Sequence, residues 1–404
     1  MKYFVLAFLC AIAVIAYVQR LGMQTAYEPI QAELYINTER FGAIGAAWLI
    51  GYALMQVPAG WLADRIGSRN ALAFYAVIWS ILTGMIGLCQ SFEMLLPIWF
   101  LMGMAQAGVF PCAAKSIATW FVDTEKATAS GLLGSFTMLG TAAASFLTTW
   151  FVYEQRWSWQ STYAVYGSLG LLWAVAFFFL VPERKGIQAI SAPMTRGDWQ
   201  LLATSVSMWL ICAQQFFRAG AMIFFINWFP KFLKESRHLT EKQAGVYTTY
   251  ANIAALCGGV LGGFFSDWLL RRTGIRRVSR QGIAVIGMTT CSVLIVVTYF
   301  VSDHIAAIAI FSLGAFIATF GGVSGYTVTI EFGGRRVATV FSIMNMCGNF
   351  GAAIFGYLAG LLKERTGSWD PALFVFAGIF AVDAVCWALL NPRGPLFEDR
   401  HETR

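Results

Sequence analysis

Charged side chains are scarce in this sequence, and acidic ones almost never fall inside its hydrophobic stretches. Asp, Glu, Lys and Arg make up 12% of the 404 residues, whereas hydrophobic residues make up 58% and the mean hydropathy is +0.64. A soluble domain of this length could not bury so much apolar surface. The sequence therefore predicts an all-α membrane protein.

Other absences exclude several classes of protein. The eight cysteines form no Cys-x-x-Cys pair and lie in apolar stretches, so neither a disulfide framework nor a metal site is expected. No histidine lies in an apolar stretch, so the serine of Gly322-Val323-Ser324-Gly325, a rhomboid-protease-like sequence, has no base. We expect no enzyme and no cofactor. The net charge of +7 gives no reason to expect nucleic acid, and the lack of an Asn-x-Ser/Thr sequon favours a bacterial inner membrane.

What the sequence does contain is a series of apolar runs of about 20 residues, each long enough to cross a hydrocarbon core of about 30 Å as a helix. The first run is longer than the core of a signal peptide and no small-x-small site follows it, so we expect it to remain as a helix. Twelve transmembrane helices are predicted near 3–27, 40–60, 71–89, 93–119, 127–152, 160–181, 200–232, 243–266, 281–300, 304–329, 335–362 and 371–391.

Basic residues indicate the orientation of these helices. Most of the 28 Lys and Arg residues fall in loops on the side of the N-terminus, and cytoplasmic loops carry such an excess. We therefore expect a multi-pass inner (plasma) membrane protein with both termini in the cytoplasm. One cytoplasmic loop, expected to be solvated, contains the cluster Arg271, Arg272, Arg276, Arg277 and Arg280.

The chain divides into two similar halves. The charged segment 182–199 is predicted to be a cytoplasmic linker between an N-terminal six-helix bundle, 1–181, and a C-terminal one, 200–391, followed by a tail at 392–404. Segments 60–69 and 263–272 follow corresponding helices and both read Gly-x-x-small-Asp and then arginine. The first helix of each half also holds one arginine, Arg20 or Arg218, roughly 25 Å along the helix.

The segment "GWLADRIGSR" at 60–69 resembles the signature loop of the major facilitator superfamily. The resemblance implies a monomer with two six-helix bundles and alternating access between them. Physically, Asp64 can accept hydrogen bonds from free amides at the start of another helix, as can Asp267 in the second copy. Arg65 and Arg69 can bridge to carboxylates of the other bundle. These four residues are predicted to gate the cytoplasmic side.

Further segments resemble the anion:cation symporter family, which includes sialin and bacterial hexuronate and galactonate transporters. They are Tyr52, Gln56 and Pro58, then "GMAQAGVFPCAAKSIATWF", "MNMCGNFGAA" and "NPRGPLFED". The resemblance implies transport of organic anions, commonly carboxylates, often driven by H⁺ or Na⁺.

The sequence departs from that family at the residues that usually carry the proton. The residue before the first-helix arginine is often acidic but is Gln19 here, and the usual arginine and glutamate of the fourth helix are Trp99 and Gln106. Glutamine cannot titrate, so proton coupling by the family route is in doubt. Arg218 instead resembles the organophosphate:phosphate antiporters, which pair an arginine from the first helix with one from the seventh.

Arginine in mid-membrane costs about 2.5–3.5 kcal/mol, so Arg20 and Arg218 are expected to face a watery cavity. Two planar guanidinium groups fit a carboxylate or a phosphate. The alternative is a structural pair with a buried acid, for which the sequence offers only Asp383 deep inside a helix. The predicted substrate-binding residues are Arg20, Arg218, Tyr17, Gln24, Tyr52, Gln106, Thr137, Asn345 and Asn349. Glu28 and Asp383 are the candidate coupling groups.

The sequence thus predicts a secondary active transporter of small organic anions, such as sugar acids. An organophosphate/phosphate or other anion exchanger is the main alternative, and a transporter-like ligand sensor is a further one. An empty cavity with two uncompensated positive charges should resist closing. We therefore hypothesise that the carrier reorients readily only when loaded, which favours anion exchange or uptake of a dianion.

Overall fold

The computed structural model describes residues 1–182, 194–237, 239–391 and 394–397. Within these ranges every regular element is helical and no β-strand occurs, which confirms the predicted all-α class. Eleven helical stretches are long and apolar enough to cross a membrane. The longest, His304–Thr366, contains two helices joined at a 3₁₀ turn, so the described residues form twelve spans as predicted.

The spans differ from the predicted ranges mainly at their ends. They are α1 (Lys2–Thr25), α3 (Thr38–Ile66), α4 (Ser68–Ile86), the pair α5 (Phe92–Gln106) and α6 (Val109–Trp120), α7 (Lys126–Thr149), α8 (Trp159–Leu180), α10 (Val206–Ile223), α12 (Glu241–Thr273), α13 (Ile283–Phe300), α14 (His304–Gly333), α15 (Val337–Thr366) and α16 (Asp370–Leu389). The shorter elements are α2 (Tyr27–Leu34), α9 (Arg196–Thr204), α11 (Phe229–Ser236), η1 (Trp150–Glu154), η2 (Phe224–Trp228), η3 (Arg277–Gly282) and η4 (Gly334–Arg336).

Polar caps define where several helices begin. The side chains of Asn37, Ser91, Ser158 and Asp303 each accept a hydrogen bond from a backbone amide in the first turn of α3, α5, α8 and α14. Thr240 forms a reciprocal capping box with Gln243 at the start of α12. These side chains satisfy amides that would otherwise lack partners at the helix ends.

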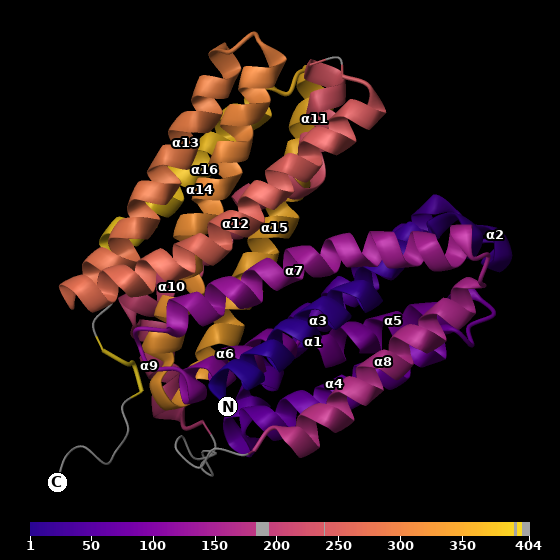
Figure 1. Ribbon diagram of the computed structural model, residues 1–404, viewed down its shortest axis with the longest axis horizontal. Coiled ribbons are helices and arrows are strands. Elements are labelled where there is room, and N and C mark those ends of the chain that lie inside the picture. The colour runs from indigo at the N-terminus through magenta and orange to yellow at the C-terminus, as the bar shows by residue number, and fades with distance from the viewer. Residues whose placement is uncertain (183–193, 238, 392–393, 398–404) are drawn as a thin grey trace.

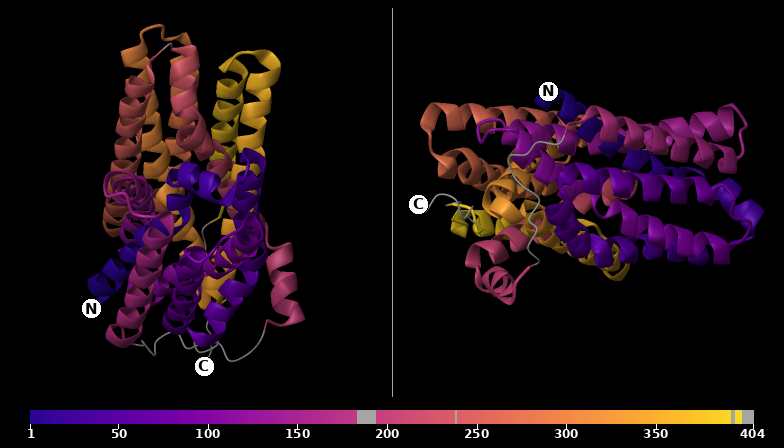
Figure 2. Two further views of the ribbon diagram at one scale, coloured as in Figure 1. Left: turned by 90° about the vertical axis from the view of Figure 1, so that its right-hand side faces the viewer. Right: turned by 90° about the horizontal axis from the view of Figure 1, so that it is seen from below.

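The helices are grouped by sequence half, as Figures 1 and 2 show. Contacts between the halves are made chiefly by α7 with α12 and by α3 with α15. The halves meet at the end where α1 begins and α16 ends, and they diverge toward the opposite end, where α2 and α11 lie (Figure 1). We call these the closed end and the open end.

The predicted linker and tail are only partly described. Residues 183–193 of the linker lie outside the described residues, and α9 begins within the predicted range, capped by a Thr195–Asp198 capping box. In the tail, 392–393 and 398–404 lie outside them. The remaining tail segment packs on the closed end, where the Leu396 amide donates to the Phe332 carbonyl.

Two glycines allow the halves to approach closely at the closed end. A Cβ on Gly60 of α3 would overlap the backbone of Ala338 in α15, and a Cβ on Gly263 of α12 would overlap that of Ala127 in α7. Small residues permit such contacts between membrane helices. The glycine of each Gly-x-x-small-Asp copy therefore sets the helix spacing one turn before its aspartate.

We predict that Gly263→Leu weakens the closed end, because overpacking a close contact costs about 1–3 kcal/mol. The halves should then spend more time with the open end shut. Spin labels at Tyr35 and Ile305, both exposed at the open end, should report shorter distances in this variant. Gly245→Leu on the same helix is the matched control, since a Cβ there meets no atom within 4 Å. Identical distance distributions for the two variants would contradict the proposed role of Gly263.

Candidate functional site

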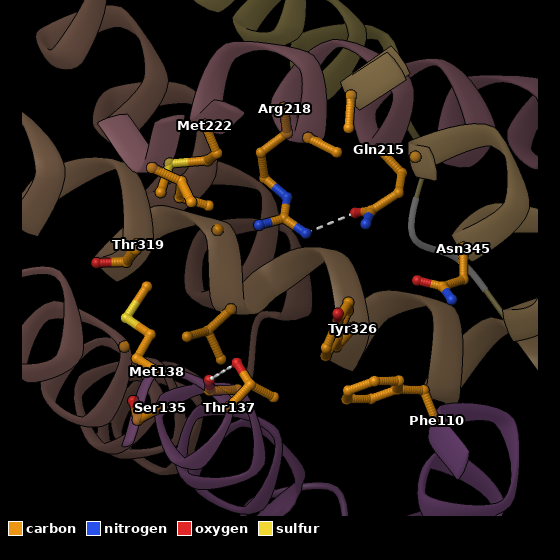
Figure 3. A pocket seen from close by; sticks show the side chains of 18 of the residues that line it. Phe110, Ser135, Thr137, Met138, Gln215, Arg218, Met222, Thr319, Tyr326 and Asn345 are labelled. Carbon is orange, nitrogen blue, oxygen red and sulfur yellow. Dashed lines mark hydrogen bonds between the residues drawn. The ribbon is translucent and has the colours of Figure 1, made fainter. Parts of the chain in front are cut away.

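A cavity of about 320 Å³ lies between the two halves. In Figure 3, Arg218 and Gln215 of α10 extend from one wall, and Thr137 and Met138 of α7 stand on the opposite wall. The predicted residues that line this cavity are Tyr17, Arg20, Tyr52, Thr137, Arg218, Asn345 and Asn349. The fold thus brings seven of the predicted binding residues together from five helices.

Arg20 is held by aromatic rings. Its guanidinium carbon lies 4.0 Å from the centroid of the Trp48 ring and 5.5 Å from that of Tyr17. The Trp48 ring in turn stacks on Tyr52, with 4.7 Å between centroids. Cation–π contact stabilises the guanidinium without neutralising it. Among the described residues Arg20 forms no ion pair, so its charge remains available to an anion.

Arg218 has a neutral partner instead. Its Nη2 donates to Gln215 Oε1 over 2.7 Å, and its guanidinium carbon lies 5.8 Å from the centroid of the Tyr326 ring. The side chain lies against Gly322 of α14, where an added Cβ would come within 3.2 Å of Nη1. The buried Nε has no hydrogen-bond partner in the described part of the chain. Arg218 therefore keeps a buried donor that is not hydrogen-bonded to any described residue.

Hydrogen-bonded amide side chains connect the two halves beside the cavity. Asn345 of α15 donates to the Tyr52 hydroxyl over 3.2 Å and to Gln56 Oε1 over 3.0 Å. Gln56 then donates to the Ala107 carbonyl over 3.0 Å, at the break between α5 and α6. A single span was predicted across this break. Gln56 thus satisfies the Ala107 carbonyl at the break and also accepts a hydrogen bond from the other half.

Two predicted substrate-binding residues do not line the cavity. Gln106 is buried and donates to the Ala16 carbonyl of α1 over 3.3 Å, and Gln24 is exposed near the end of α1. Gln19 likewise donates to the Tyr166 carbonyl over 2.7 Å. Gln19 and Gln106 therefore bind helices of the first half together. The candidate coupling residue Glu28 lies on α2, exposed and outside the cavity.

Sequence reasoning missed several polar residues of the cavity, among them Gln215 and Tyr326. Gln215 lies three residues before Arg218, a spacing that places both on one face of a helix. Tyr326 lies four residues after Gly322, the glycine against which Arg218 packs. The first signal was available in the sequence, whereas the second depends on how α14 faces α10.

The predicted gating aspartate Asp64 is buried at the closed end, where it caps α15. Its carboxylate accepts from the amides of Ala338, over 3.2 Å, and Thr339, over 2.9 Å. Lys115 of α6 pairs with it at 3.1 Å and also donates to the Ala63 carbonyl. A carboxylate near the amides of a helix start is favoured by both hydrogen bonding and the helix dipole.

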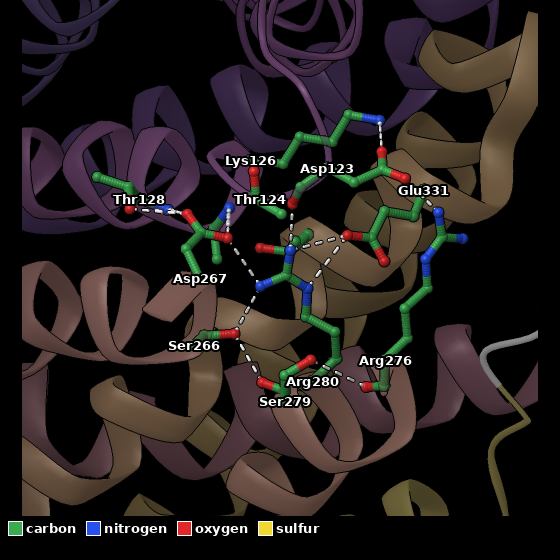
Figure 4. Close-up of polar contacts among 12 residues, drawn as sticks. Asp123, Thr124, Lys126, Thr128, Ser266, Asp267, Arg276, Ser279, Arg280 and Glu331 are labelled. Carbon is green, nitrogen blue, oxygen red and sulfur yellow. Dashed lines mark hydrogen bonds and ion pairs between the residues drawn. The ribbon is translucent and has the colours of Figure 1, made fainter. Parts of the chain in front are cut away.

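Asp267 makes the equivalent contact in the other direction. It accepts from the amides of Ala127, over 3.3 Å, and Thr128, over 2.7 Å, at the start of α7. Arg280 binds it at 2.9 Å and also binds Glu331 at 3.0 Å (Figure 4). Arg280 is fully buried, so the expectation that its loop is solvated was wrong for this residue.

An outer layer of ion pairs lies beside this network. Asp123 pairs with Lys126 at 2.7 Å and with Arg276 of the η3 region. Burial raises the pKa of the Asp123 carboxyl, but the two cations outweigh burial and hold that pKa below its usual value. The Asp123 ion pairs are therefore fully formed at neutral pH and are lost only as the pH falls through this lowered value.

The other two predicted gating residues behave differently in this state. Arg69 donates from Nε to the Phe178 carbonyl over 3.2 Å, within its own half. Arg65 lies over the Trp61 ring, 5.4 Å from its centroid. Neither bridges to a carboxylate of the other half among the described residues, because carbonyl and aromatic partners lie closer.

We predict that Asp267→Asn loosens the start of α7, since an amide cannot replace the charge that Arg280 and two backbone amides contact. Hydrogen bonds to a charged group contribute about 1.5–3 kcal/mol, so the Ala127 and Thr128 amides should exchange hydrogen roughly tenfold faster or more. The Ala338 and Thr339 amides, capped by Asp64, serve as the internal reference.

Asp303→Asn is the matched control for Asp267→Asn, because Asp303 caps α14 at the open end through the Ala306 amide over 2.7 Å. It should leave exchange at both closed-end caps unchanged. Equal exchange of the Ala127 and Thr128 amides in Asp267→Asn and the unmodified protein would show that Asp267 does not hold the closed end.

Comparison with known proteins agrees with this architecture. The "Probable sulfoacetate transporter" of Cupriavidus necator is 27% identical over 97% of this chain and 94% of its own length. The "Probable galactarate/D-glucarate transporter" of Escherichia coli K12 is 25% identical, covering 96% and 94%, and the "Hexuronate transporter" of Bacillus subtilis is 29% identical, covering 94% and 92%. These relatives are of the kind that the anion:cation symporter resemblance predicts.

A solved structure and a family model complete the comparison. The crystal structure of the E. coli fucose:proton symporter superposes with a TM-score of 0.78 at 15% identity, covering 96% of this chain and 99% of that one. The model of the Major Facilitator Superfamily matches residues 9–354. With its two bundles, paired aspartate caps and central cavity, the chain belongs to the Major Facilitator Superfamily of transporters and is not an enzyme.

Proposed function

We propose that this protein is a secondary active transporter that moves small organic anions across a bacterial inner membrane by alternating access. The observation that carries the proposal is that one arginine from each half lines a single cavity and neither pairs with a carboxylate of the described chain. The relatives support the substrate class, because sulfoacetate, galactarate, glucarate and hexuronate are all acids.

Arg20 and Arg218 bind the acidic groups in this proposal. Each guanidinium offers a planar fork of donors that an ammonium lacks. Because the two arginines belong to different halves, an anion that contacts both gains or loses contacts as the halves rock. Such a difference in binding between states is what allows a ligand to drive a conformational change.

Two arginines suit a molecule with two acidic groups, such as a dicarboxylate. Tyr17, Tyr52, Thr137, Asn345 and Asn349 line the same cavity and supply donors and acceptors for hydroxyl groups. Gln24 and Gln106 have no part in this binding site. A sugar dicarboxylate therefore fits both the charge and the remaining polar groups.

The positive-inside pattern supports a cytoplasmic location for the closed end. The structure then corresponds to a carrier that faces outward, with Asp64 and Asp267 holding its cytoplasmic side shut. Opening inward requires both aspartate caps to release their helix starts.

We expect labelled galactarate or sulfoacetate to exchange across proteoliposomes that contain the purified protein, and the same anions to raise its melting temperature. Sugar phosphates, tested in parallel, address the organophosphate exchanger. A ligand that raises the melting temperature but supports no counterflow would indicate a sensor and would sink the transporter proposal.

We predict that Arg20→Lys and Arg218→Lys each reduce counterflow at least tenfold, because a lost charge-assisted hydrogen bond is worth about 1.5–3 kcal/mol. Melting temperatures without ligand should change little. Arg40→Lys is the matched control, since Arg40 is exposed at the open end and its guanidinium lies over the Phe92 ring. Unchanged counterflow in both cavity variants would rule out the arginine clamp.

A further inference from the structure

One buried acid in the membrane helices is not accounted for by the anion site or by the closed end. The Asp383 side chain of α16 is fully buried, and neither carboxyl oxygen has a hydrogen-bond partner among the described residues. By contrast, the buried acids at the closed end, Asp64, Asp267 and Glu331, each bind a lysine or arginine. A carboxylate without compensating bonds is strongly disfavoured in such surroundings, so Asp383 is held in its neutral, protonated form.

Among the residues that the structure describes, one cation influences Asp383. The Arg218 guanidinium, on the neighbouring helix α10, lies within electrostatic range of the carboxyl. The other ionisable groups that face it are the thiols of Cys291, from α13, and Cys386, from α16 itself.

The remaining elements that pack on α16 direct their ionisable groups elsewhere. On η3, Arg280 binds Asp267 and Glu331, and Arg277 binds Gln281. On α15, the free thiol of Cys347 is hydrogen-bonded to the free thiol of Cys212 on α10. Arg218 is thus the charged group through which Asp383 can act.

The anion cavity itself offers no proton carrier. The described residues that line it include neither aspartate nor glutamate. Gln19 and Gln106 cannot titrate and are bonded to backbone carbonyls. A proton that accompanies the anion must therefore bind elsewhere, at a group that can influence the anion.

We propose that Asp383 binds a proton together with each transported anion, and that it acts on the anion through Arg218. This inference rests on the proposed function of the cavity. When Asp383 is protonated, the charge of Arg218 is free to bind the anion. When Asp383 releases its proton to water, the new carboxylate attracts Arg218 and competes with the anion for it.

The two binding events are therefore linked in the same direction. Protonation of Asp383 strengthens anion binding, and by thermodynamic reciprocity anion binding strengthens protonation. Symport of proton and anion follows from this linkage. In the empty carrier, an Arg218–Asp383 pair would also reduce the uncompensated positive charge of the cavity and ease its closure. The carrier could then return empty, so exchange would not be obligatory.

The decisive variant is Asp383→Asn, which mimics the protonated side chain permanently. In proteoliposomes loaded at neutral pH and placed in acidic medium, the unmodified protein should accumulate labelled galactarate or sulfoacetate above equilibrium. Asp383→Asn should retain counterflow but lose this accumulation. Its anion affinity should also become independent of pH, whereas the unmodified protein should gain roughly tenfold per pH unit as the pH falls through the titration of Asp383.

Asp370→Asn is the matched control, because Asp370 lies on the same helix but is exposed at its start. It should behave like the unmodified protein. Accumulation by Asp383→Asn equal to that of the control would overturn the inference and leave the anion transporter intact. Absence of counterflow in the unmodified protein would instead refute the proposed function.

If Asp383→Asn also loses counterflow, Asp383→Glu and proton uptake decide the matter. Asp383→Glu should restore pH-driven accumulation. In weakly buffered detergent solution, at a pH high enough that Asp383 of the empty protein has released its proton, addition of galactarate or sulfoacetate to the unmodified protein should withdraw up to one proton per anion bound. No proton uptake, or no rescue by glutamate, would refute the role of Asp383.

Discussion

A guanidinium group at membrane depth must have either water, aromatic rings or an acid beside it, and this constraint shapes the centre of the molecule. Arg20 rests on Trp48 and Tyr17, and Arg218 is bonded to the neutral Gln215. Neither solution cancels the positive charge. The cavity between the halves is therefore where these charges can remain hydrated until an anion replaces the water.

The closed end meets the opposite requirement, because its charges are removed from water and must be compensated within the protein. Asp64 and Asp267 each accept two amides from a helix start of the other half and each bind one cation. Taking one partner away leaves a buried charge, so breaking either cap is costly. The same pattern of glycine and aspartate in both sequence halves therefore provides two contacts that hold the halves together at the closed end.

The sequence allowed prediction of features that depend on composition and spacing, and it failed where helix rotation decides. Apolar runs of membrane length located the twelve spans, and the repeated glycine–aspartate pattern located both caps. Whether Gln106 faces the cavity or α1 depends on how α5 turns within its bundle, which spacing along one helix does not determine. Arg280 was predicted to lie in a solvated loop because its buried partner, Glu331, is far away in the sequence. The break after Gln106 was not predicted, because the Ala107 carbonyl that it exposes finds its partner, Gln56, on another helix.

The two arginines occupy corresponding positions in the repeat, but they are not equivalent. Arg20 lies against the aromatic stack of Trp48 and Tyr52 and forms no ion pair among the described residues. Arg218 donates a hydrogen bond to the neutral amide of Gln215 and lies within electrostatic range of the buried Asp383. A carrier that couples two gradients needs one constant contact to the substrate and one contact that changes with the second ion. In the mechanism that we propose, the asymmetry between the halves supplies both: Arg20 provides the constant contact, and Arg218 exchanges an anion in the cavity for a carboxylate of its own bundle.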